Sequence, residues 1–354
     1  MTKDGKDVDR QAEETGQRYT QAATDLEGLQ ARMFHQPNGE RLLAHLKDHY
    51  GIDAVAATKV SHHNDHVFRV DRRDGDPWIA RAFSPARPRA GVEGDAAILR
   101  FLERHDYPAE RLAADNAVST FGDSTVLVTQ FVPGGPLPMA VGHEGSEKFA
   151  IMGDLLGRLH TLPFGESVNR AGGASGDDPS REGSPRQDLM AALAFLDSVD
   201  TKVTPNDRER FEWLRDQARS ADDGQGLPEA LLHGNLLHAP DHVILGDRGP
   251  VAISWKAAGL GPRLADFAWL MWGTWGNPDW IDLAAGAYRK HAELTDDELE
   301  RLEAVMYIRP LYLGCFSYRR ELVNDRPPGQ EVWGFVNPEH IGAIAAATRA
   351  AYRR

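Results

Sequence analysis

Residues 231–255 read LLHGNLLHAPDHVILGDRGPVAISW, and the rest of the chain is organised around this stretch. An apolar pair leads into His233-Gly234-Asn235, and a loop rich in His and Pro follows. Two short apolar runs, 242–245 and 250–255, then flank the segment Gly246-Asp247-Arg248-Gly249. Asp and Gly adopt the backbone angles that a tight turn needs, so this pattern predicts a β-hairpin directly after a polar loop.

A polar loop that leads into a hairpin is also how a kinase catalytic loop meets its metal-binding strand. The stretch resembles the aminoglycoside phosphotransferase family, which is related to choline kinases and protein kinases. Members usually carry H-G-D-x-x-x-x-N and, after a hairpin, I-D-W. Here the two strings are His233-Gly234-Asn235 and Ile253-Ser254-Trp255. The frame of the motif is kept, whereas both of its acids are replaced.

The resemblance implies an α+β, two-lobed protein-kinase-like fold with a small β-rich N-lobe and a larger helical C-lobe. We expect residues 1–37 to form a polar N-terminal extension and residues 38–133 to form the N-lobe. The break Pro133-Gly134-Gly135-Pro136 separates the lobes, so the helical C-lobe covers 134–354. Within it, residues 165–188 are too rich in Gly, Ser and Asp to pack, which predicts a flexible loop or lid.

Composition narrows the class of function. The chain has 354 residues, 41% of them hydrophobic, and its 40 basic and 53 acidic residues give a net charge of −13. That charge opposes binding to nucleic acid or an anionic membrane and favours cationic ligands. The single Cys315 excludes an internal disulfide. No signal peptide and no apolar run of about 18 residues is present, so we expect a cytoplasmic protein.

The N-lobe pattern begins with a helix that has apolar residues at 42, 43, 46 and 50 and stops at Gly51. Two strands, 67–70 and 78–83, follow as a hairpin. In the family this hairpin covers the nucleotide, and its second strand carries a phosphate-binding cation, which is Arg81 here. The preceding loop, residues 62–66, lacks the glycines of a phosphate-cradling loop.

A helix is predicted around residues 92–102. Kinases use an acid on this helix to hold the strand cation; Glu93 and Asp95 are both candidates, and Asp95 fits the family spacing better. The β-branched run 125–132 resembles the strand that enters the hinge between the lobes. The resemblance implies that main-chain groups of Gln130, Phe131 and Val132 bind the adenine edge of a nucleotide.

Beyond the hinge, helical patterns at 150–160, 189–199 and 207–218 build the C-lobe, and another helix starts after Pro262. On that helix Asp266 matches the family's acid that braces the catalytic loop. The nearby Trp269 and Trp272 are expected in the core, although a ligand-binding role stays open. Arg309-Pro310 predicts a local break in the last helical region.

The substitutions bear directly on phosphoryl transfer. Asn235 cannot accept a proton near neutral pH, but its amide oxygen can still orient a hydroxyl. Ser254 offers a neutral hydroxyl where Mg²⁺ needs a carboxylate. The family's metal-binding Asn would fall on Pro240, so Asp241 or His242 could replace it, and Asp241 would be a replacement acid. His233 corresponds to the histidine that braces the backbone of the catalytic loop.

Three functions stay open from the sequence. The first is a pseudokinase-like protein that binds a small molecule, a peptide or a partner enzyme and needs no cofactor. The second is an active phosphotransferase that uses ATP and Mg²⁺ on a hydroxyl of a natural product or of Ser/Thr in a peptide precursor. The third is a metal site on the His-rich loop, with His233, His238, Asp241 and His242 as candidate ligands. We favour the first; its expected site comprises Asn235, Asp241 and His233 as the catalytic-loop set and Arg81, Asp95, Gln130, Phe131, Val132 and Ser254 as the nucleotide side.

Overall fold

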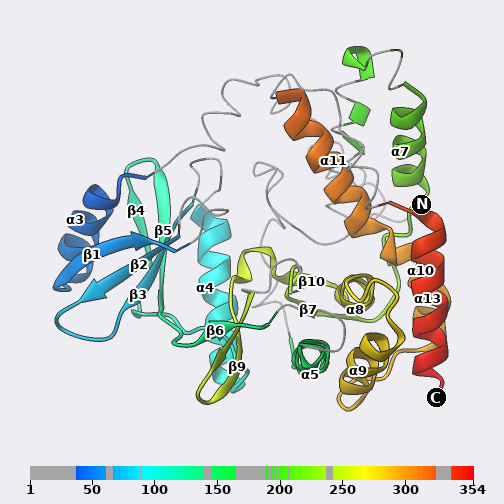
Figure 1. Ribbon diagram of the computed structural model, residues 1–354. Coiled ribbons are helices and arrows are strands. Elements are labelled where there is room, and N and C mark those ends of the chain that lie inside the picture. Colours follow the sequence, from blue (N-terminus) through cyan, green and yellow to red (C-terminus); the bar gives the residue numbers. More distant parts are fainter. Residues whose placement is uncertain are drawn as a thin grey trace, which may run out of the picture.

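The computed structural model describes residues 37–60, 67–83, 85, 87, 89–138, 145–164, 189, 193–194, 196–197, 200–203, 205, 208–236, 242–323 and 336–354. The expected extension at 1–37 lies outside these residues except for its last position, and the expected loop at 165–188 lies outside them entirely. The loop at 62–66 and the candidate residues His238 and Asp241 also lie outside them. Figure 1 shows a β-rich lobe on one side and a helical lobe on the other.

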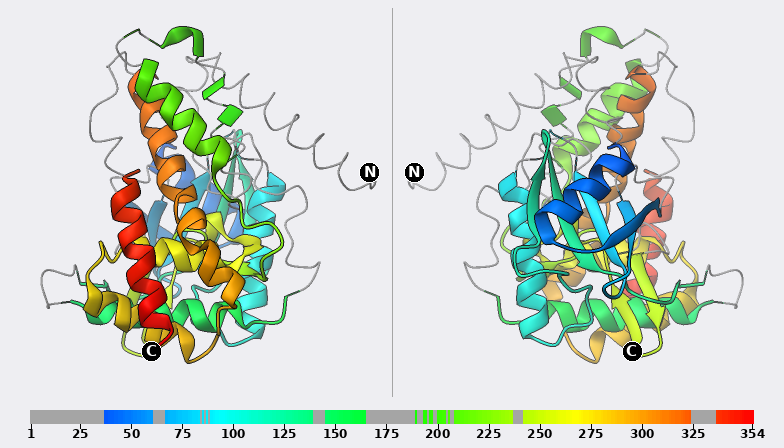
Figure 2. Two further views of the ribbon diagram at one scale, coloured as in Figure 1. Left: turned by 90° about the vertical axis from the view of Figure 1, so that its right-hand side faces the viewer. Right: turned by 90° about the vertical axis from the view of Figure 1, so that its left-hand side faces the viewer.

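The β-rich lobe is built on one antiparallel sheet with the strand order β1-β2-β3-β5-β4. Helix α3 lies across the face of the sheet that points away from the helical lobe (Figure 2), and α4 lies on the opposite side. The elements of this lobe are α3 (Gly39–Tyr50), β1 (Ala54–Lys59), β2 (Val67–Arg72), β3 (Trp78–Phe83), α4 (Arg89–Arg104), β4 (Val118–Phe121) and β5 (Ser124–Gln130).

Strand β3 decides which side chains face the helical lobe. Its buried residues alternate with half-buried ones, and Trp78 packs edge-on against Tyr50 of α3 at a centroid distance of 5.6 Å. Successive side chains of a strand point to opposite faces. Arg81 lies three positions after Trp78, so its side chain is on the opposite face of the sheet. It therefore points away from α3 and toward the junction of the lobes.

Short strands connect the two lobes. The chain leaves β5 and pairs as β6 (Gly135–Pro136) with β8 (Val243–Gly246), which forms a hairpin with β9 (Gly249–Ala252). Gly246 pairs with Gly249, so a two-residue turn closes the hairpin, as the sequence predicts. A second ribbon joins β7 (Glu229–Leu232) to β10 (Gly259–Pro262).

The helical lobe packs its helices around the central ribbons (Figure 1). Two glycines on α5 allow close contact with α9, because a Cβ on Gly153 would clash with the carbonyl oxygen of Ala284 and one on Gly157 would lie 2.7 Å from that of Tyr288. The helices are α5 (Glu147–His160), α7 (Arg208–Ser220), α8 (Arg263–Trp272), α9 (Pro278–Arg289), α10 (Asp296–Met306), α11 (Ile308–Val323) and α13 (Pro338–Tyr352).

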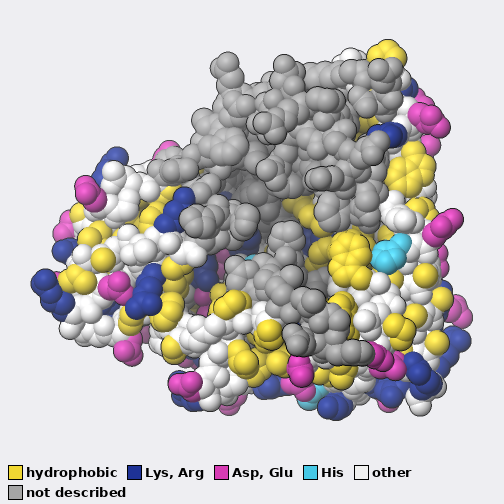
Figure 3. All heavy atoms as spheres, in the orientation of Figure 1, with side chains coloured by type: hydrophobic (Ala, Val, Ile, Leu, Met, Phe, Trp, Pro, Cys, Tyr) yellow, Lys and Arg dark blue, Asp and Glu magenta, His cyan; other side chains and the backbone are white. Residues whose placement is uncertain are grey.

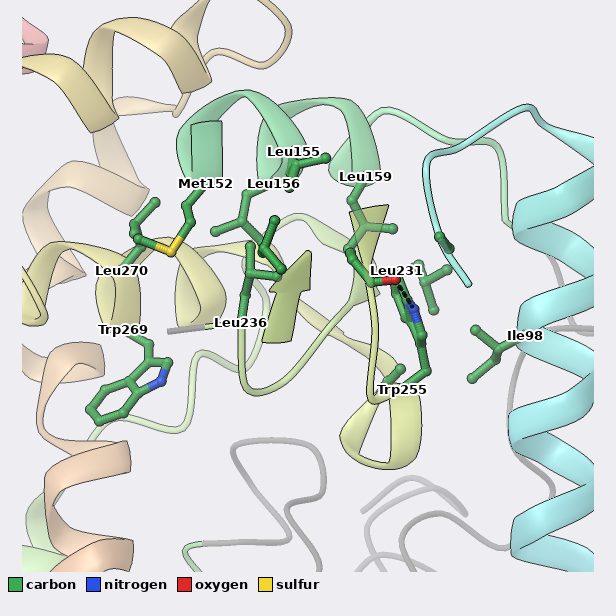
Figure 4. Close-up of a cluster of buried hydrophobic side chains, with 14 of the residues drawn as sticks. Ile98, Met152, Leu155, Leu156, Leu159, Leu231, Leu236, Trp255, Trp269 and Leu270 are labelled. Atoms are coloured by element: carbon green, nitrogen blue, oxygen red, sulfur yellow. Dashed lines mark hydrogen bonds between the residues drawn. The ribbon is translucent and has the colours of Figure 1, made fainter. Parts of the chain in front are cut away.

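One large hydrophobic core continues through both lobes. In Figure 4, Leu155 and Leu159 of α5 and Ile98 of α4 gather around Leu231 and Trp255. A smaller second cluster joins α7 to α11 through Phe211, Leu214, Leu311 and Cys315 among others. Across the part of the chain that is described, no helix is long and apolar enough to span a membrane.

Most of the predicted elements are present, and one boundary is wrong. Helix α3 is confirmed: the Asn38 side chain accepts hydrogen bonds at its start, and Gly51 ends it in the left-handed conformation. The expected break at Arg309-Pro310 instead falls at Tyr307, between α10 and α11. Pro310 lies in the first turn of α11, where a missing backbone N–H costs little because no intrahelical partner exists there.

Candidate functional site

The catalytic-loop position begins where β7 ends, and His233 fixes its backbone. This side chain is fully buried; its Nε2 donates to the carbonyl oxygen of Ile253 at 3.0 Å, and its Nδ1 accepts from the amide of Asn235 at 3.3 Å. Burial, with a smaller effect of the nearby His242, lowers the pKa of His233 to about 4. The imidazole is therefore neutral near pH 7, as both hydrogen bonds require.

Asp266 of α8 holds the same loop from beneath. Its carboxylate accepts from the amides of His233 at 2.7 Å and of Gly234 at 3.1 Å, and His160 Nε2 lies 3.7 Å away. Burial alone would raise the pKa of the Asp266 carboxyl, but His160 and the donors at His233 lower it below its ordinary value. The bracing role that the resemblance implies for Asp266 is confirmed.

Asn235 occupies the position of the family's catalytic acid. The residue is 4% exposed, and its carbonyl oxygen accepts from Nδ1 of His242 at 2.7 Å. Its side-chain oxygen Oδ1 is buried and has no hydrogen-bond partner among the described residues. A buried amide oxygen without a partner is an acceptor that a ligand hydroxyl could satisfy.

Ser254 follows β9 at the position of the family's metal-binding acid. It has φ +71° and ψ +54°, which is the left-handed region that non-glycine residues rarely adopt. Its amide donates to Oε1 of Glu110 at 2.7 Å. Strained backbone of this kind is typical of functional positions.

Arg81 is paired with an acid that the sequence did not suggest. Its Nη2 lies 2.8 Å from Oε2 of Glu110, and its Nη1 donates to the hydroxyl of Thr129 at 3.0 Å. The Thr129 hydroxyl in turn donates to the same Glu110 oxygen at 3.0 Å. Glu110 thus contacts both the strand cation and the backbone of Ser254.

The expected pairing of Asp95 with Arg81 is wrong. Asp95 of α4 is almost completely buried and forms its ion pair with Arg87 at 2.5 Å, while Glu93 pairs with Arg89 on the exposed side of the helix. Arg87 also stacks on Phe83 at 4.1 Å. Arg87 lies in the loop just before α4, so its guanidinium is closer to this helix than the side chain of Arg81 on β3 is.

The hinge offers fewer main-chain groups than the resemblance implies. The amide of Gln130 donates to Arg111 at 2.8 Å, and the amide of Phe131 donates to Pro77 at 3.0 Å. Both N–H groups are therefore used within the chain. Of the three expected residues, Val132 is the one whose N–H makes no such bond within the described part of the chain.

A divalent cation does not fit the described groups at this site. Asn235 and Ser254 present a neutral amide and a hydroxyl, and the carboxylate of Glu110 already accepts from Arg81, Thr129 and Ser254. Magnesium prefers free carboxylates and phosphate oxygens. In the described ranges, no group of three or more His, Cys, Asp or Glu side chains is arranged to hold a metal. His233 and His242, two of the candidate zinc ligands, bond backbone groups instead.

Helix α11 brings a further cation to the loop. Arg309 donates to the carbonyl oxygen of Gly234, and its guanidinium carbon lies 6.0 Å from the ring centre of Trp269. Trp269 and Trp272 are 5% exposed each and stack on one another, as expected for core residues. Trp275, which follows them, is 57% exposed. Sequence reasoning missed both Glu110 and Arg309, since neither lies in a motif.

The face of the molecule drawn in Figure 3 is mixed in charge where its residues are described. Figure 3 shows basic and acidic side chains interspersed over the visible face, with hydrophobic side chains between them. The net charge of −13 therefore does not appear as one acidic surface on this side of the molecule.

Comparisons with known proteins agree on the family and the fold. The model of the phosphotransferase enzyme family matches residues 56–304. No curated protein sequence matches the chain. Several solved structures are similar to it at low sequence identity.

Three of these structures illustrate the similarity. Choline kinase from Streptococcus pneumoniae has a TM-score of 0.59 and 11% identity, covering 87% of this chain and 99% of its own. A macrolide 2′-phosphotransferase from Brachybacterium faecium has a TM-score of 0.51 and 22% identity, covering 87% and 98%. A spectinomycin phosphotransferase in complex with ADP and spectinomycin has a TM-score of 0.54 and 13% identity, covering 89% and 100%. The expected two-lobed kinase-like fold is confirmed.

Proposed function

The chain belongs to the phosphotransferase enzyme family, and we propose that it is a degenerate member, which binds a ligand between its lobes without ordinary Mg²⁺-dependent phosphoryl transfer. One observation carries the proposal: the backbone frame of the site is intact while its chemical groups are replaced. Asp266 and His233 hold the loop, and Ser254 adopts a left-handed conformation. Neither Asn235 nor Ser254 supplies a carboxylate.

The energetic consequence differs between the two positions. Loss of a general base slows a reaction by roughly two to four orders of magnitude, so Asn235 alone would leave slow transfer. Loss of the metal ligand is more serious, because the metal neutralises the charge that develops on the transferred phosphoryl group. Glu110, the acid beside Ser254, already accepts from three donors of the chain itself. It therefore supports Arg81 better than it would hold Mg²⁺.

The ligand that we propose is a small molecule. Phosphotransferases of similar fold carry names that refer to macrolides, choline and spectinomycin, and one was solved with ADP. A peptide or a partner enzyme is an alternative occupant. The buried Oδ1 of Asn235 favours a ligand with a hydrogen-bond donor, such as a hydroxyl group, since that oxygen can only accept a hydrogen bond.

The same oxygen supports a second candidate, an active ATP-dependent kinase. An amide oxygen can orient an attacking hydroxyl of a natural product or of Ser/Thr in a peptide precursor, and a loose transition state tolerates a weak base. This candidate needs a replacement acid. Asp241, which lies outside the described residues, is the residue that the sequence offers.

ATP binding and turnover separate the two candidates. We would measure ATP affinity with and without Mg²⁺, and then ATP hydrolysis, for the wild type and for Asn235→Asp/Ser254→Asp. If the protein is degenerate, the wild type should bind ATP equally well with and without Mg²⁺ and should hydrolyse ATP only at the background rate. Mg²⁺-dependent ATP binding and ATP hydrolysis should both appear only in the double variant. The exposed Asp247→Asn, in the turn of the same hairpin, is the control for a change of charge. Tight Mg²⁺-dependent binding with wild-type turnover would establish the active kinase instead.

A further inference from the structure

Glu110 lies in the segment between α4 and β4, outside the motifs on which the resemblance to the family rests. We propose that Glu110 is a positioning residue of the phosphate site, which takes over from the α4 acid the task of orienting Arg81 for a phosphate oxygen. The ligand chemistry is that of a nucleoside triphosphate. The inference rests on the proposed function in one respect, which is that a ligand binds between the lobes. Its test measures ATP affinity, whereas the proposed function is tested by ATP turnover.

Glu110 is fixed by the fold and not by Arg81. Its amide donates to the carbonyl of Ala252 at 3.0 Å, and the amide of Ala252 donates to Pro108 at 2.8 Å, so this segment runs alongside β9 as an extra strand-like bridge. The carboxylate then accepts from the amide of Ser254 two residues further on. Glu110 is thereby part of the backbone framework that shapes the end of β9.

The carboxylate orients the guanidinium from behind. Arg81 donates to Glu110 and to Thr129, and Thr129 donates to Glu110, which closes a triangle of hydrogen bonds. A rigid guanidinium held at two points has little remaining rotamer freedom. It has five N–H donors, so this arrangement leaves donors for phosphate oxygens.

The alternative role for Glu110 is that of an internal anion, which would occupy Arg81 and block it from binding a phosphate. The exposure of the two side chains argues against that role, because Arg81 is 12% exposed and Glu110 only 3%. The accessible part of the pair is the cation, and the acid lies on its buried side. A second acid is also unnecessary on α4, since Asp95 is engaged by Arg87.

The experiment measures binding of ATP and of adenosine, both without metal, by isothermal titration calorimetry. Glu110→Gln keeps the shape of the side chain and removes its charge; we expect ATP affinity to fall by roughly tenfold to a hundredfold. Adenosine lacks phosphates, so its affinity should stay unchanged. A merely structural role would weaken both ligands.

Arg81→Gln and the double variant Arg81→Gln/Glu110→Gln test whether Glu110 acts through Arg81. The double variant should bind ATP no more weakly than Arg81→Gln, because the positioned group is already absent. Glu93→Gln, which removes an exposed acid from α4, is the matched control and should bind like the wild type. If Glu110→Gln fails to fold, Thr129→Val tests the same triangle with a nearly unchanged side-chain volume, and a smaller loss of ATP affinity is expected.

Three results would overturn the proposal. The first is tighter ATP binding by Glu110→Gln, which would make Glu110 a blocking group. The second is additive losses in the double variant. The third is a wild type that binds no ATP, which would leave the degenerate binding protein possible with another ligand. Wild-type turnover with Mg²⁺ would refute the proposed function while leaving the affinity test of Glu110 valid.

Discussion

Nε2 of His233 donates to the carbonyl oxygen of Ile253 at 3.0 Å and so joins the catalytic-loop position to the segment between β9 and Ser254. This single contact holds the two halves of the family motif in register. It needs a neutral imidazole with its proton on Nε2, since Nδ1 accepts from the amide of Asn235.

The stability of the fold should therefore depend on pH through His233. Its folded-state pKa of about 4 lies below the ordinary value of 6.5, so the unfolded chain binds a proton first as the pH falls. Neutral His233 therefore contributes about 3 kcal/mol to the free energy of unfolding. This contribution is fully present above pH 6.5 and is lost as the pH falls toward 4. Urea unfolding at several pH values measures this. His233→Gln should show a correspondingly shallower dependence, and an unchanged slope in that variant would exclude His233 as the cause.

The buried pair of Arg87 and Asp95 should be costly to break on one side only. Arg87→Met removes the cation that pairs with the buried carboxylate of Asp95, which should lower the free energy of unfolding by about 3–5 kcal/mol. Arg87→Met/Asp95→Leu should recover most of that loss. The exposed pair of Arg89 and Glu93 is the control, and Arg89→Met should cost at most about 1 kcal/mol. A double variant no better than the single one would contradict this account.

Asp266 should be required for the conformation of the catalytic loop. Asp266→Asn removes the charge and turns one acceptor oxygen into a donor that faces the amides of His233 and Gly234. We expect a loss of about 2–3 kcal/mol in the free energy of unfolding and faster amide exchange at both residues. Hydrogen exchange followed by mass spectrometry reads the loop directly, and protection equal to that of the wild type would refute the bracing role.

The contact of α5 with α9 should depend on Gly153. In Gly153→Ala the new methyl group clashes with the carbonyl oxygen of Ala284, so α9 must move, at a cost of about 1–3 kcal/mol. Gly286→Ala on α9 is the matched control, because nothing lies within 4 Å of its added Cβ. There the better helix propensity of Ala should stabilise the protein by about 0.5–1 kcal/mol. Equal thermal stabilities of the two variants would show that the approach of the helices is not limiting.

Several helices and strands, and the backbone arrangement of the site, can be predicted from local sequence patterns. Helix α3 is predictable because its apolar spacing, its Asn38 cap and its Gly51 stop act within one segment. The central hairpin is predictable because a two-residue turn between apolar runs fixes its register. The roles of His233 and Asp266 follow from the family motif, and both are confirmed in their contacts.

The pairing of the buried charges could be found only in the folded chain. The sequence offered Asp95 for Arg81, whereas the folded chain pairs Asp95 with Arg87 and Arg81 with Glu110. Acids along a chain are chemically alike, so local pattern cannot choose between them. Which acid pairs with Arg81 depends on where the segment after α4 runs beside β9. That position is set by packing between segments that are distant in sequence. The replacement of both motif acids can be read from the sequence, but the support behind Arg81 could be found only in the folded protein.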